Sequence, residues 1–392
     1  MRIFMLTWEY PPRIIGGLAR HVEGLSKSLV ALGHEVHIVT LDFPGAQREE
    51  QSGSLYIHRV PVEVPGPTFH TWVLLFNHFF EKKVGQIASE FGKPDLVHMH
   101  DWLTVSAGVG AKHLLRAPLV MTFHSTESSR SSGSPSPEST MVEGLEWWGS
   151  FEATQVIAVS AWMKSDVITQ FKLPQEKVAE IPNGIDIAKF SGPVDAEAFR
   201  EKWKVQPEER LITAVGRLTS QKGFDDLIRA YPEIQRAVPR SRLLVMGDGY
   251  MRGELESLAE AQKVKGSTTF AGFVSDSDIV SALKVSDVVA VPSRFEPFGI
   301  IALEAMAGGS PLVVSKVGGL AEIVEDGVDG LEVEPNDPPS LAKAAVRVLS
   351  DKTLATHLVA KAREKVKAYN WESSAAKTLE VYERAVGGAK FE

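Results

Sequence analysis

The stretch Val288–Met306, which reads VVAVPSRFEPFGIIALEAM, decides the fold around it. Its first part, Val288–Val291, is a short apolar run rich in β-branched residues, which predicts a buried strand that ends at Pro292. Ile300–Ala307 contains helix formers and neither Gly nor Pro, which predicts a helix. A strand, a loop and a helix in this order place free backbone N–H groups at the carboxyl edge of a sheet. Open α/β sheets bind ligands at that edge, so the stretch predicts an anion site.

Two carboxylates flank the loop of this stretch. Glu296 lies before the predicted helix, and Glu304 lies inside it, on the turn after the cluster of N–H groups. Because an acid beside a phosphate would repel it, we expect both side chains to face hydroxyl groups, such as those of a sugar and a ribose. Spacing alone also fits a simpler interpretation, in which Glu296 is a helix N-terminal charge and Glu304 is a solvated helix position.

The run EPFGIIALEAMAGG, from Glu296 to Gly309, resembles the Glu-x7-Glu signature of retaining GT-B glycosyltransferases of family 4, in the glycogen synthase-like branch. The resemblance implies an α/β fold of two Rossmann-like domains, with parallel sheets that face each other across a deep cleft. It implies that Glu296 contacts the donor sugar and that Glu304 contacts the nucleotide ribose. The amides that the resemblance assigns to the sugar and phosphate are those of Phe298, Gly299, Ile300 and Ile301.

The composition of the chain limits what it can be. With 392 residues, of which 44% are hydrophobic and 23% are charged, it can bury a large core, and two domains are the default at this length. The net charge of −8 argues against nonspecific binding of nucleic acid. The chain has no cysteine, which excludes disulfides and thiolate chemistry. Neither a signal peptide nor an apolar run of membrane-spanning length is recognisable, so we expect a cytoplasmic protein.

Four segments are predicted along the chain. Residues 1–190 form an N-terminal Rossmann-like acceptor domain, and the polar segment 191–208, with its prolines, forms a linker. Residues 209–370 form a C-terminal Rossmann-like domain for the nucleotide sugar. Residues 371–392 form a terminal helix, which the resemblance implies returns to the N-terminal domain.

A glycine pair marks the first strand–helix junction. The order of a strand (2–7), a loop, a helix (18–32) and a strand (35–40) predicts a βαβ unit. Gly16 and Gly17 open its helix and let backbone N–H groups approach a ligand without a Cβ in the way. An ordinary glycine turn would look the same. The pair matches the Gly-Gly-Leu loop of the family, which implies contact with the donor phosphates.

Three further strand ends of the first domain carry polar residues. The strand-like run DLVHMH ends before Asp101, PLVMTFH ends on His124, and the turn IPNGID contains Asn183. The resemblance implies that Asp101 and Asn183 line the sugar pocket and that His124 lies beside the anomeric carbon. His98 and His100 would share one strand face, as metal ligands can, but no third ligand is evident from the sequence.

The second domain begins with a strand that delivers two cations to its carboxyl edge. Arg217 and Lys222 belong to the run GRLTSQKG, which ends at Gly223 and leads into a helix. Two fixed cations can neutralise a diphosphate without a metal, although Arg and Lys are more often solvated surface charges. The run matches the Gly-Arg-Leu-x-x-x-Lys-Gly pattern of the family, which implies that both cations contact the pyrophosphate.

No metal site and no cofactor are predicted. Asp276 and Asp278 form a DxD pair, which metal-dependent glycosyltransferases of another fold use. A Ser-x-x-Asp capping box that starts at Ser275 explains the pair more simply.

Two segments are each compatible with more than one structure. The aromatic segment Thr68–Phe91 could be an amphipathic helix for a membrane surface, but its few basic residues favour a helix packed on the sheet, so no membrane partner is expected. The Ser- and Pro-rich segment Ser125–Thr140 is expected to be a flexible lid or a partly disordered loop, followed by a helix from Met141.

The resemblance implies transfer of glucose from ADP-glucose or UDP-glucose to an α-glucan, in an α-1,4 linkage with retained configuration. The expected partners are the nucleotide sugar and a carbohydrate acceptor, and the oligomeric state is left open. Alternative acceptors are glucose 1-phosphate, glucose, a polyol or a lipid. Other classes on this fold are a UDP-sugar 2-epimerase and a silent carbohydrate-binding protein, which the complete set of cations and carboxylates disfavours.

Overall fold

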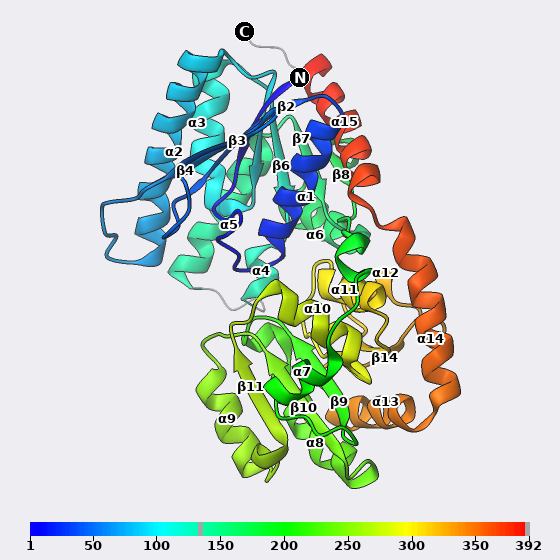
Figure 1. Cartoon of the computed structure of the whole chain (residues 1–392). Helices are drawn as coiled ribbons and strands as arrows, with labels where there is room; N and C mark the ends of the chain where they lie inside the picture. Colours follow the sequence, from blue (N-terminus) through cyan, green and yellow to red (C-terminus); the bar gives the residue numbers. More distant parts are fainter. Residues whose placement is uncertain (132–135, 389–392) are drawn as a thin grey trace. The chain divides into compact units, whose positions relative to one another are not determined.

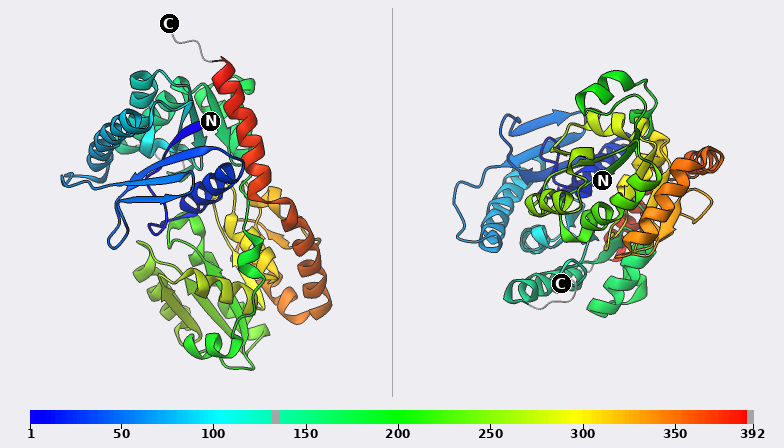
Figure 2. Two further views of the ribbon diagram at one scale, coloured as in Figure 1. Left: turned by 45° about the horizontal axis from the view of Figure 1, so that its top comes forward. Right: turned by 90° about the horizontal axis from the view of Figure 1, so that it is seen from below.

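The computed structural model describes residues 1–131 and 136–388, and these residues divide into two compact units. The first unit contains residues 1–184 together with the segment from Asn370 onward, and the second contains Ile185–Tyr369. Each unit is a mainly parallel sheet covered by helices on both faces (Figures 1 and 2). The prediction of two Rossmann-like α/β domains is therefore confirmed.

The sheet of the first unit has the strand order β3-β4-β2-β1-β5-β6-β7-β8, and its neighbouring strands are parallel except for the antiparallel pair β3–β4. Its inner strands are buried on both faces, which is why their sequences are continuous apolar runs rather than alternating ones. The strands are β1 (Arg2–Leu6), β2 (Glu35–Leu41), β3 (Glu49–Ser52), β4 (Leu55–Val60), β5 (Leu96–His100), β6 (Leu119–Phe123), β7 (Gln155–Ala158) and β8 (Val178–Glu180).

The helices of the first unit cover the two faces of this sheet. Helix α15 lies beside α1 on one face, and α2 packs with α3 on the other (Figure 1). The buried side chains of α1 recur every three to four residues, as expected of a helix with one apolar face. The helices are α1 (Gly17–Ala31), α2 (Phe69–Phe91), α3 (Val105–Leu115), α4 (Glu127–Arg130), α5 (Pro137–Glu152), α6 (Ala161–Phe171) and α15 (Trp371–Gly388).

Helix α2 is the helix predicted over the aromatic segment, and Thr68 caps its N-terminus. Its large apolar residues Phe76 and Phe80 are fully buried in the first unit. Within residues 1–131 and 136–388, no helix is long and apolar enough to cross a membrane.

The sheet of the second unit is entirely parallel, with the order β11-β10-β9-β12-β13-β14. Alternate residues of its strands face two different cores. Ile212 and Leu243 belong to the larger core, and Leu211 and Leu244 belong to the smaller core on the other face. The strands are β9 (Arg210–Val215), β10 (Ser241–Met246), β11 (Thr268–Gly272), β12 (Val288–Val291), β13 (Leu312–Ser315) and β14 (Leu331–Val333).

Helices also cover both faces of the second sheet. The larger core includes buried residues of α8, α9 and α13, whereas α7 and α10 contribute to the smaller one. The helices are α7 (Ala196–Lys202), α8 (Phe224–Ala237), α9 (Arg252–Ala261), α10 (Asp276–Val285), α11 (Ile300–Gly308), α12 (Leu320–Ile323), α13 (Pro338–Ser350) and α14 (Lys352–Lys365).

The structure corrects the predicted linker. Residues 191–208 belong to the second unit, where α7 packs against α10. Phe199 of α7 and Val205, which follows the helix, are buried in the smaller core. The segment looked like a linker because α7 is short and buries only one of its residues, so its composition is mostly polar. The chain passes from the first unit to the second between Gly184 and Ile185.

Most of the described residues in the segment that was predicted to be a flexible lid or a partly disordered loop are helical in the structure. Residues 127–130 form α4, and α5 begins at Pro137 instead of Met141. A capping box between Ser136 and Ser139 fixes this start, with Pro137 at the first helical position. Residues 132–135 lie outside the described part of the chain.

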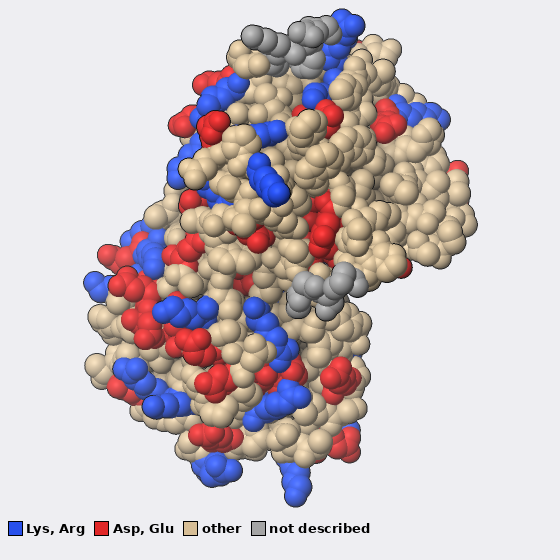
Figure 3. Space-filling model, turned by 180° about the vertical axis from the view of Figure 1, so that it is seen from behind, with Lys and Arg blue, Asp and Glu red and all other residues tan. Residues whose placement is uncertain are grey.

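Charged side chains of both signs are interspersed over the face drawn in Figure 3. Lysine and arginine side chains lie next to aspartate and glutamate over much of that face, in keeping with the many surface ion pairs of the structure.

Candidate active site

The carboxyl ends of β5 and β6 bring two predicted site residues together. The strands are parallel neighbours, so Asp101 and His124, which follow them, lie side by side. Oδ1 of Asp101 accepts a hydrogen bond of 2.7 Å from the backbone N–H of His124. Asp101 has a φ of 56°, an uncommon backbone conformation for a residue with a side chain. Through the hydrogen bond to His124, the Asp101 carboxylate fixes the start of the loop that follows β6.

A cluster of three imidazoles surrounds this point. His21 of α1 lies 4.5 Å from His124 between ring centroids, and Nδ1 of His100 lies 3.2 Å from Nε2 of His124. Oδ1 of Asn183 lies 2.7 Å from Nδ1 of His21, so the structure places Asn183 behind this cluster. Asn183 thus contacts His21, and His21 contacts His124. The sequence did not predict His21 as a site residue.

The cluster is kept uncharged. Burial holds the pKa values of His21 and His100 well below the usual range and lowers that of His124 to about 3. Burial raises the pKa of Asp101 to about 6. Near neutral pH the edge therefore offers imidazole lone pairs and N–H donors rather than positive charge.

The same three histidines are the residues that could hold a metal. One ring nitrogen from each lies within 4.8 Å of the others, and Nε2 of both His21 and His100 is buried without a hydrogen-bond partner. The sequence suggested His98 beside His100, but the structure places His98 between Thr122 and Tyr382. The partners of His100 come from α1 and from the end of β6, which strand periodicity cannot reveal.

A buried acid behind this edge was also missed. Glu146 of α5 accepts hydrogen bonds from the backbone N–H of Glu127, and Arg130 reaches one of its oxygens at 3.1 Å. Burial raises the pKa of Glu146 to about 8. Because Arg130 also donates to Ser125, the residue after His124 in the sequence is tied to the same network. No sequence signal separates Glu146 from the solvated acids of α5.

The glycine pair at the start of α1 has a partner inside its own unit. Oε2 of Glu9 accepts hydrogen bonds from the N–H groups of Ile15, at 2.5 Å, and of Gly16, at 3.1 Å. The amide of Gly16, which was expected to be open to a ligand, is therefore occupied in this structure. Gly17 is exposed at the first position of α1.

In the second unit, the loops after β9 and β12 bring a predicted cation to a predicted acid. Nζ of Lys222 lies 2.6 Å from Oε2 of Glu296, which also accepts a hydrogen bond from Ser293. The loops approach closely at Gly223, where φ is 62° and a Cβ would lie 2.0 Å from the carbonyl oxygen of Pro292. Only glycine fits there, which gives a physical reason for the Lys-Gly pair.

Arg294 fastens these loops and was not predicted as a site residue. It donates to the carbonyl oxygen of Ser220 at 2.9 Å, forms an ion pair with Asp225 at 2.8 Å and contacts Asn336. Arg217, the other predicted cation, is exposed at the end of β9. The pair of cations thus differs: Lys222 is held by Glu296, whereas the Arg217 side chain lies at the surface.

Helix α11 supplies the remaining predicted residues. Gly299 precedes it with a φ of 106°, and Phe298 is buried, while Ile300 and Ile301 form its first turn. Glu304 is only 9% exposed, so the alternative of a solvated helix position is wrong. The edge of the second unit therefore combines a helix N-terminus, a held lysine and two buried carboxylates. Such a set can bind phosphate oxygens and sugar hydroxyls together.

The acidic pair Asp276–Asp278 caps a helix, as predicted. Ser275 and Asp278 form a capping box at the start of α10, and Asp278 also pairs with Lys202 at 2.6 Å. Both interactions are structural, which agrees with the simpler interpretation of the DxD pair.

Sequence families match both units. Residues 15–189 match Glycosyltransferase Family 4, and residues 195–365 match Glycosyl transferases group 1. An uncharacterised glycosyltransferase of Methanocaldococcus jannaschii is 41% identical over 390 residues, which cover 98% of this chain and 99% of that protein. A glycogen synthase of Mycobacterium tuberculosis is 34% identical over 408 residues, which cover 100% of this chain and 96% of that protein.

Solved structures agree with the fold. The sucrose-phosphate synthase of Thermosynechococcus elongatus superimposes with a TM-score of 0.84 at 25% identity, over 99% of each chain. Two Rossmann-like α/β domains that match these families define a glycosyltransferase of the GT-B type. This chain belongs to the family 4 (group 1) glycosyltransferases, and it is a nucleotide-sugar-dependent enzyme.

Proposed function

We propose that this enzyme transfers glucose from ADP-glucose or UDP-glucose to an α-glucan, with an α-1,4 linkage and retention of configuration. The likeness to a glycogen synthase over the whole chain supports the glucan acceptor. The observation that carries the proposal is the 2.6 Å contact between Lys222 and Glu296 beside the start of α11. It holds a cation for phosphate and an acceptor group for sugar hydroxyls next to each other.

The residues of the second unit have separate tasks in this proposal. Arg217 and Lys222 neutralise the diphosphate as it leaves, and the amides of residues 298–301 bind its oxygens and the sugar. Glu296 accepts hydrogen bonds from the donor sugar, and Glu304 accepts them from the ribose. The donor is a substrate, and the enzyme needs neither a cofactor nor a metal.

The residues of the first unit favour front-face transfer. A double displacement requires a carboxylate free to attack the anomeric carbon, but Oδ1 of Asp101 already accepts the amide of His124. In the proposed step the bond from the anomeric carbon to the diphosphate breaks, and a bond to the acceptor oxygen forms. The acceptor proton passes to the departing phosphate oxygen. The backbone carbonyl of His124 stabilises the oxocarbenium-like centre, and Asn183 supports the pocket through His21.

A second candidate differs only in the acceptor. Sucrose-phosphate synthase, a structural neighbour, is named for a small phosphorylated product. A cavity in the first unit that contains Arg13 favours such an acceptor here. In this candidate the donor chemistry of the second unit is unchanged.

Product analysis tests the proposal. The enzyme is incubated with ADP-glucose or UDP-glucose, with and without glycogen, and products are followed by mass spectrometry and by NMR of the anomeric proton. We expect glycogen-dependent release of nucleoside diphosphate and new α-1,4 linkages. A β-linked product would exclude retention, and an epimerised sugar formed without acceptor would identify an isomerase. Binding of glycogen without any turnover would leave a carbohydrate-binding protein.

A further inference from the structure

Three histidines of the first unit form a triangle beside the carboxyl ends of β5 and β6. The ring centroid of His21 lies 5.3 Å from that of His100 and 4.5 Å from that of His124, and the last two lie 5.4 Å apart. One ring nitrogen of each lies within 4.8 Å of the others, and no other three histidine or acidic side chains in residues 1–131 and 136–388 come together as ligands in this way. The proposed transfer uses the backbone carbonyl of His124, so Nε2 of His21 and of His100 have no task in it.

A hydrogen bond fixes the position of the proton on His21. Nδ1 of His21 lies 2.7 Å from Oδ1 of Asn183. An amide oxygen can only accept, so the N–H of the uncharged ring is on Nδ1 and the lone pair is on Nε2. Histidines that bind metal ions characteristically donate their second N–H to an oxygen in this manner. Among the described residues, Nε2 of His21 has no hydrogen-bond partner, although it is buried.

The other two rings supply the remaining nitrogens. Nδ1 of His100 lies 3.2 Å from Nε2 of His124. Zinc binds imidazole nitrogens at about 2.0–2.1 Å in tetrahedral sites, which places two such ligands about 3.4 Å apart. The observed separation therefore matches one edge of a zinc tetrahedron. Because all three nitrogens lie within 4.8 Å of one another, the third ligand needs to come at most about 1.4 Å closer. Nε2 of His100 is also buried without a partner in the described residues.

A second pair of buried histidines in the same unit shows the contrast. Nδ1 of His37 lies 3.1 Å from Nε2 of His58. The outer nitrogens of the pair contact carboxylates, at 2.8 Å from Glu35 and 2.5 Å from Glu49. Each of these four ring nitrogens therefore has a protein partner. Buried polar atoms are normally satisfied, as in this pair, so the two unpartnered nitrogens of the triangle indicate a ligand that the protein itself does not supply.

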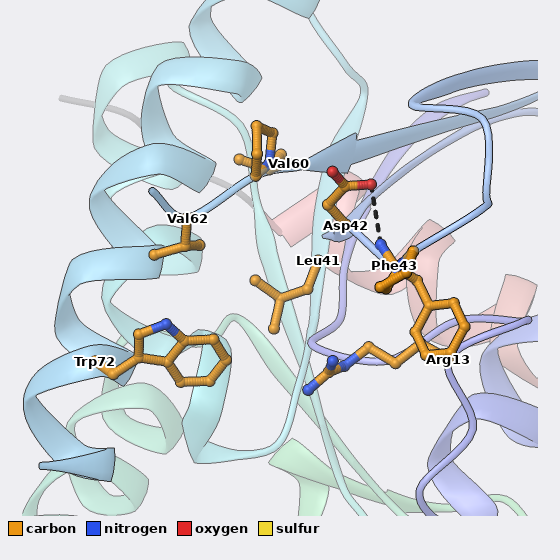
Figure 4. Close-up of a pocket in the computed structure, with 9 residues that line it drawn as sticks. Arg13, Leu41, Asp42, Phe43, Val60, Val62 and Trp72 are labelled. Carbon is orange, nitrogen blue, oxygen red and sulfur yellow. Dashed lines mark hydrogen bonds between the residues drawn. The ribbon is translucent and has the colours of Figure 1, made fainter. Parts of the chain in front are cut away.

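The cavity at the carboxyl ends of β2 and β4 offers no comparable set of ligands (Figure 4). None of the described residues that line it is a histidine. The guanidinium of Arg13 extends into it, and the carboxylate of Asp42 already accepts the N–H of Phe43 at 2.9 Å (Figure 4). A fixed cation repels a metal ion. The triangle is therefore the better place for a metal ion in the first unit.

We propose that His21, His100 and His124 bind a divalent transition-metal ion such as Zn²⁺, and that the bound ion inhibits glycosyl transfer. Imidazole ligands suit zinc, copper and nickel, whereas magnesium and calcium prefer oxygen ligands. Three protein ligands leave the fourth position of a tetrahedral ion to water. The binding stands on the geometry of the first unit alone, and the inhibition rests on the proposed function.

The bound ion opposes the proposed transfer by its charge. The oxocarbenium-like centre is positive, and the proposed step places it beside the backbone carbonyl of His124. An ion on the His124 ring adds two positive charges near that carbonyl, whereas uncharged imidazoles add none. Like charges at close range raise the barrier. The ion should therefore lower kcat, while the proposed contacts of the nucleotide belong to the second unit and remain unchanged.

Calorimetry with Zn²⁺ alone tests the binding without any turnover. The untagged full chain is first treated with EDTA and dialysed, and Mg²⁺ is the comparison ion. The variants are His21→Gln, His100→Gln and Asn183→Leu. The matched control is His58→Gln, which removes a buried histidine whose ring nitrogens already have partners. Thermal melting checks that each variant folds, and the absorption spectrum of Co²⁺ bound to wild type reports tetrahedral coordination even where a variant does not fold.

We expect one Zn²⁺ per wild-type chain and no binding of Mg²⁺. Asn183→Leu removes the group that orients His21, and such a loss typically costs about tenfold to a hundredfold in metal affinity. His21→Gln and His100→Gln should cost at least as much, and His58→Gln should cost nothing. In transfer assays at a fixed concentration of free Zn²⁺, wild type and His58→Gln should lose turnover and regain it with EDTA. The residual turnover of His21→Gln should not respond to Zn²⁺.

Three results would overturn the inference. They are a wild-type chain that binds no stoichiometric Zn²⁺, a Zn²⁺ affinity that His21→Gln and His100→Gln leave unchanged, and a turnover that bound Zn²⁺ leaves unchanged or increases. Each leaves the proposed transfer to glycogen standing. Conversely, an enzyme that binds Zn²⁺ through these histidines but releases no nucleoside diphosphate from either donor, with or without EDTA, would contradict the proposed function and leave the metal site standing.

Discussion

The carboxyl edges of the two parallel sheets use different chemistry. At the edge of the first unit the polar side chains are buried, and most of them are neutral imidazoles. The carboxylate of Asp101 accepts a hydrogen bond from a backbone amide. The edge of the second unit carries charged side chains. Lys222 forms an ion pair with Glu296 and is 24% exposed, and Arg217 is exposed. Similar folds thus provide one edge with mostly uncharged groups and one edge that keeps fixed charges. The comparison teaches that the loops at the strand ends, rather than the sheets, decide which substrate part each unit can bind.

The largest effect should come from the cations of the second unit. We expect Lys222→Ala and Arg217→Ala each to raise the barrier of transfer by roughly 3–4 kcal/mol, because charge develops on the departing diphosphate. Thermal stability should change little. Steady-state turnover at saturating donor measures the effect, with Lys265→Ala as the control because Lys265 is a surface lysine whose ion-pair partner is Glu260. Wild-type turnover in both variants would show that the cations of the second unit do not act on the departing diphosphate.

Asp101 tests whether the first edge is structural or nucleophilic. Asp101→Asn keeps an oxygen for the amide of His124, whereas Asp101→Ala leaves that buried amide unpaired, at a cost of roughly 1–3 kcal/mol. We expect the Ala variant to lose stability and turnover and the Asn variant to keep most of both. Urea unfolding and kcat are the measurements. If Asn abolishes turnover as completely as Ala does while folding normally, the carboxylate acts on the substrate and front-face transfer is wrong.

Acid should weaken the first unit more than the second. Ten of the eleven histidines lie in the first unit, and those with pKa values lowered by burial are His21, His37, His58, His98, His100 and His124, together with the less buried His34. A lowered folded pKa gives stability that is present above the unfolded value, near 6.5, and is lost as pH falls below it. For His124 this loss continues toward its folded pKa of about 3. Each such histidine contributes up to about 1.4 kcal/mol per pH unit.

Two carboxyls of the first unit act in the opposite direction. The pKa values of Asp101 and Glu146 are raised by burial, to about 6 and about 8, so they favour the folded state at low pH and lose that contribution as pH rises through those values. They are fewer than the histidines, and we expect net destabilisation from pH 7 to pH 5. Hydrogen exchange read by mass spectrometry at both pH values resolves the units. Glu146→Gln should change the pH dependence of this protection. Equal protection of the first unit at pH 5 and pH 7 would contradict the expected destabilisation by acid.

The two carboxylates of the second unit should have separable roles. Glu304→Gln keeps the shape of the side chain but weakens a charge-assisted hydrogen bond, so it should reduce binding of ADP and UDP alike by roughly 1 kcal/mol. Glu296→Gln should impair transfer and leave nucleotide binding nearly intact. Calorimetry of both variants with ADP and UDP is the test. The assignment is reversed if Glu296→Gln loses nucleotide affinity and Glu304→Gln does not.

The smallest effect should follow removal of metal ions. Because the proposed diphosphate cations are side chains, enzyme treated with EDTA should keep most of its transfer rate. A loss of activity that Mg²⁺ or Mn²⁺ restores would show that the side-chain cations are insufficient. A loss that Zn²⁺ alone restores would point instead to the cluster of His21, His100 and His124, whose ring nitrogens lie close enough to share an ion.

The sequence by itself determined the two α/β domains and most strand ends. Apolar runs, glycine turns and the capping box at Ser275 are local signals, and the structure confirms the elements they predict. The same local signals located Lys222 and Glu296, because each lies in a loop directly after a strand. They failed over residues 191–208, since α7 buries too few residues to show an apolar face.

Tertiary structure alone decided which of these groups meet. His21 of α1 meets His100 and His124, which lie far from it in the chain, because α1 packs on the sheet to which β5 and β6 also belong. Glu9 accepts the amide N–H of Gly16, whereas the buried Nε of Arg13 has no hydrogen-bond partner, although both residues follow the same strand. Which side chains pair depends on packing between distant segments, and periodicity in a single sequence carries no information about that pairing.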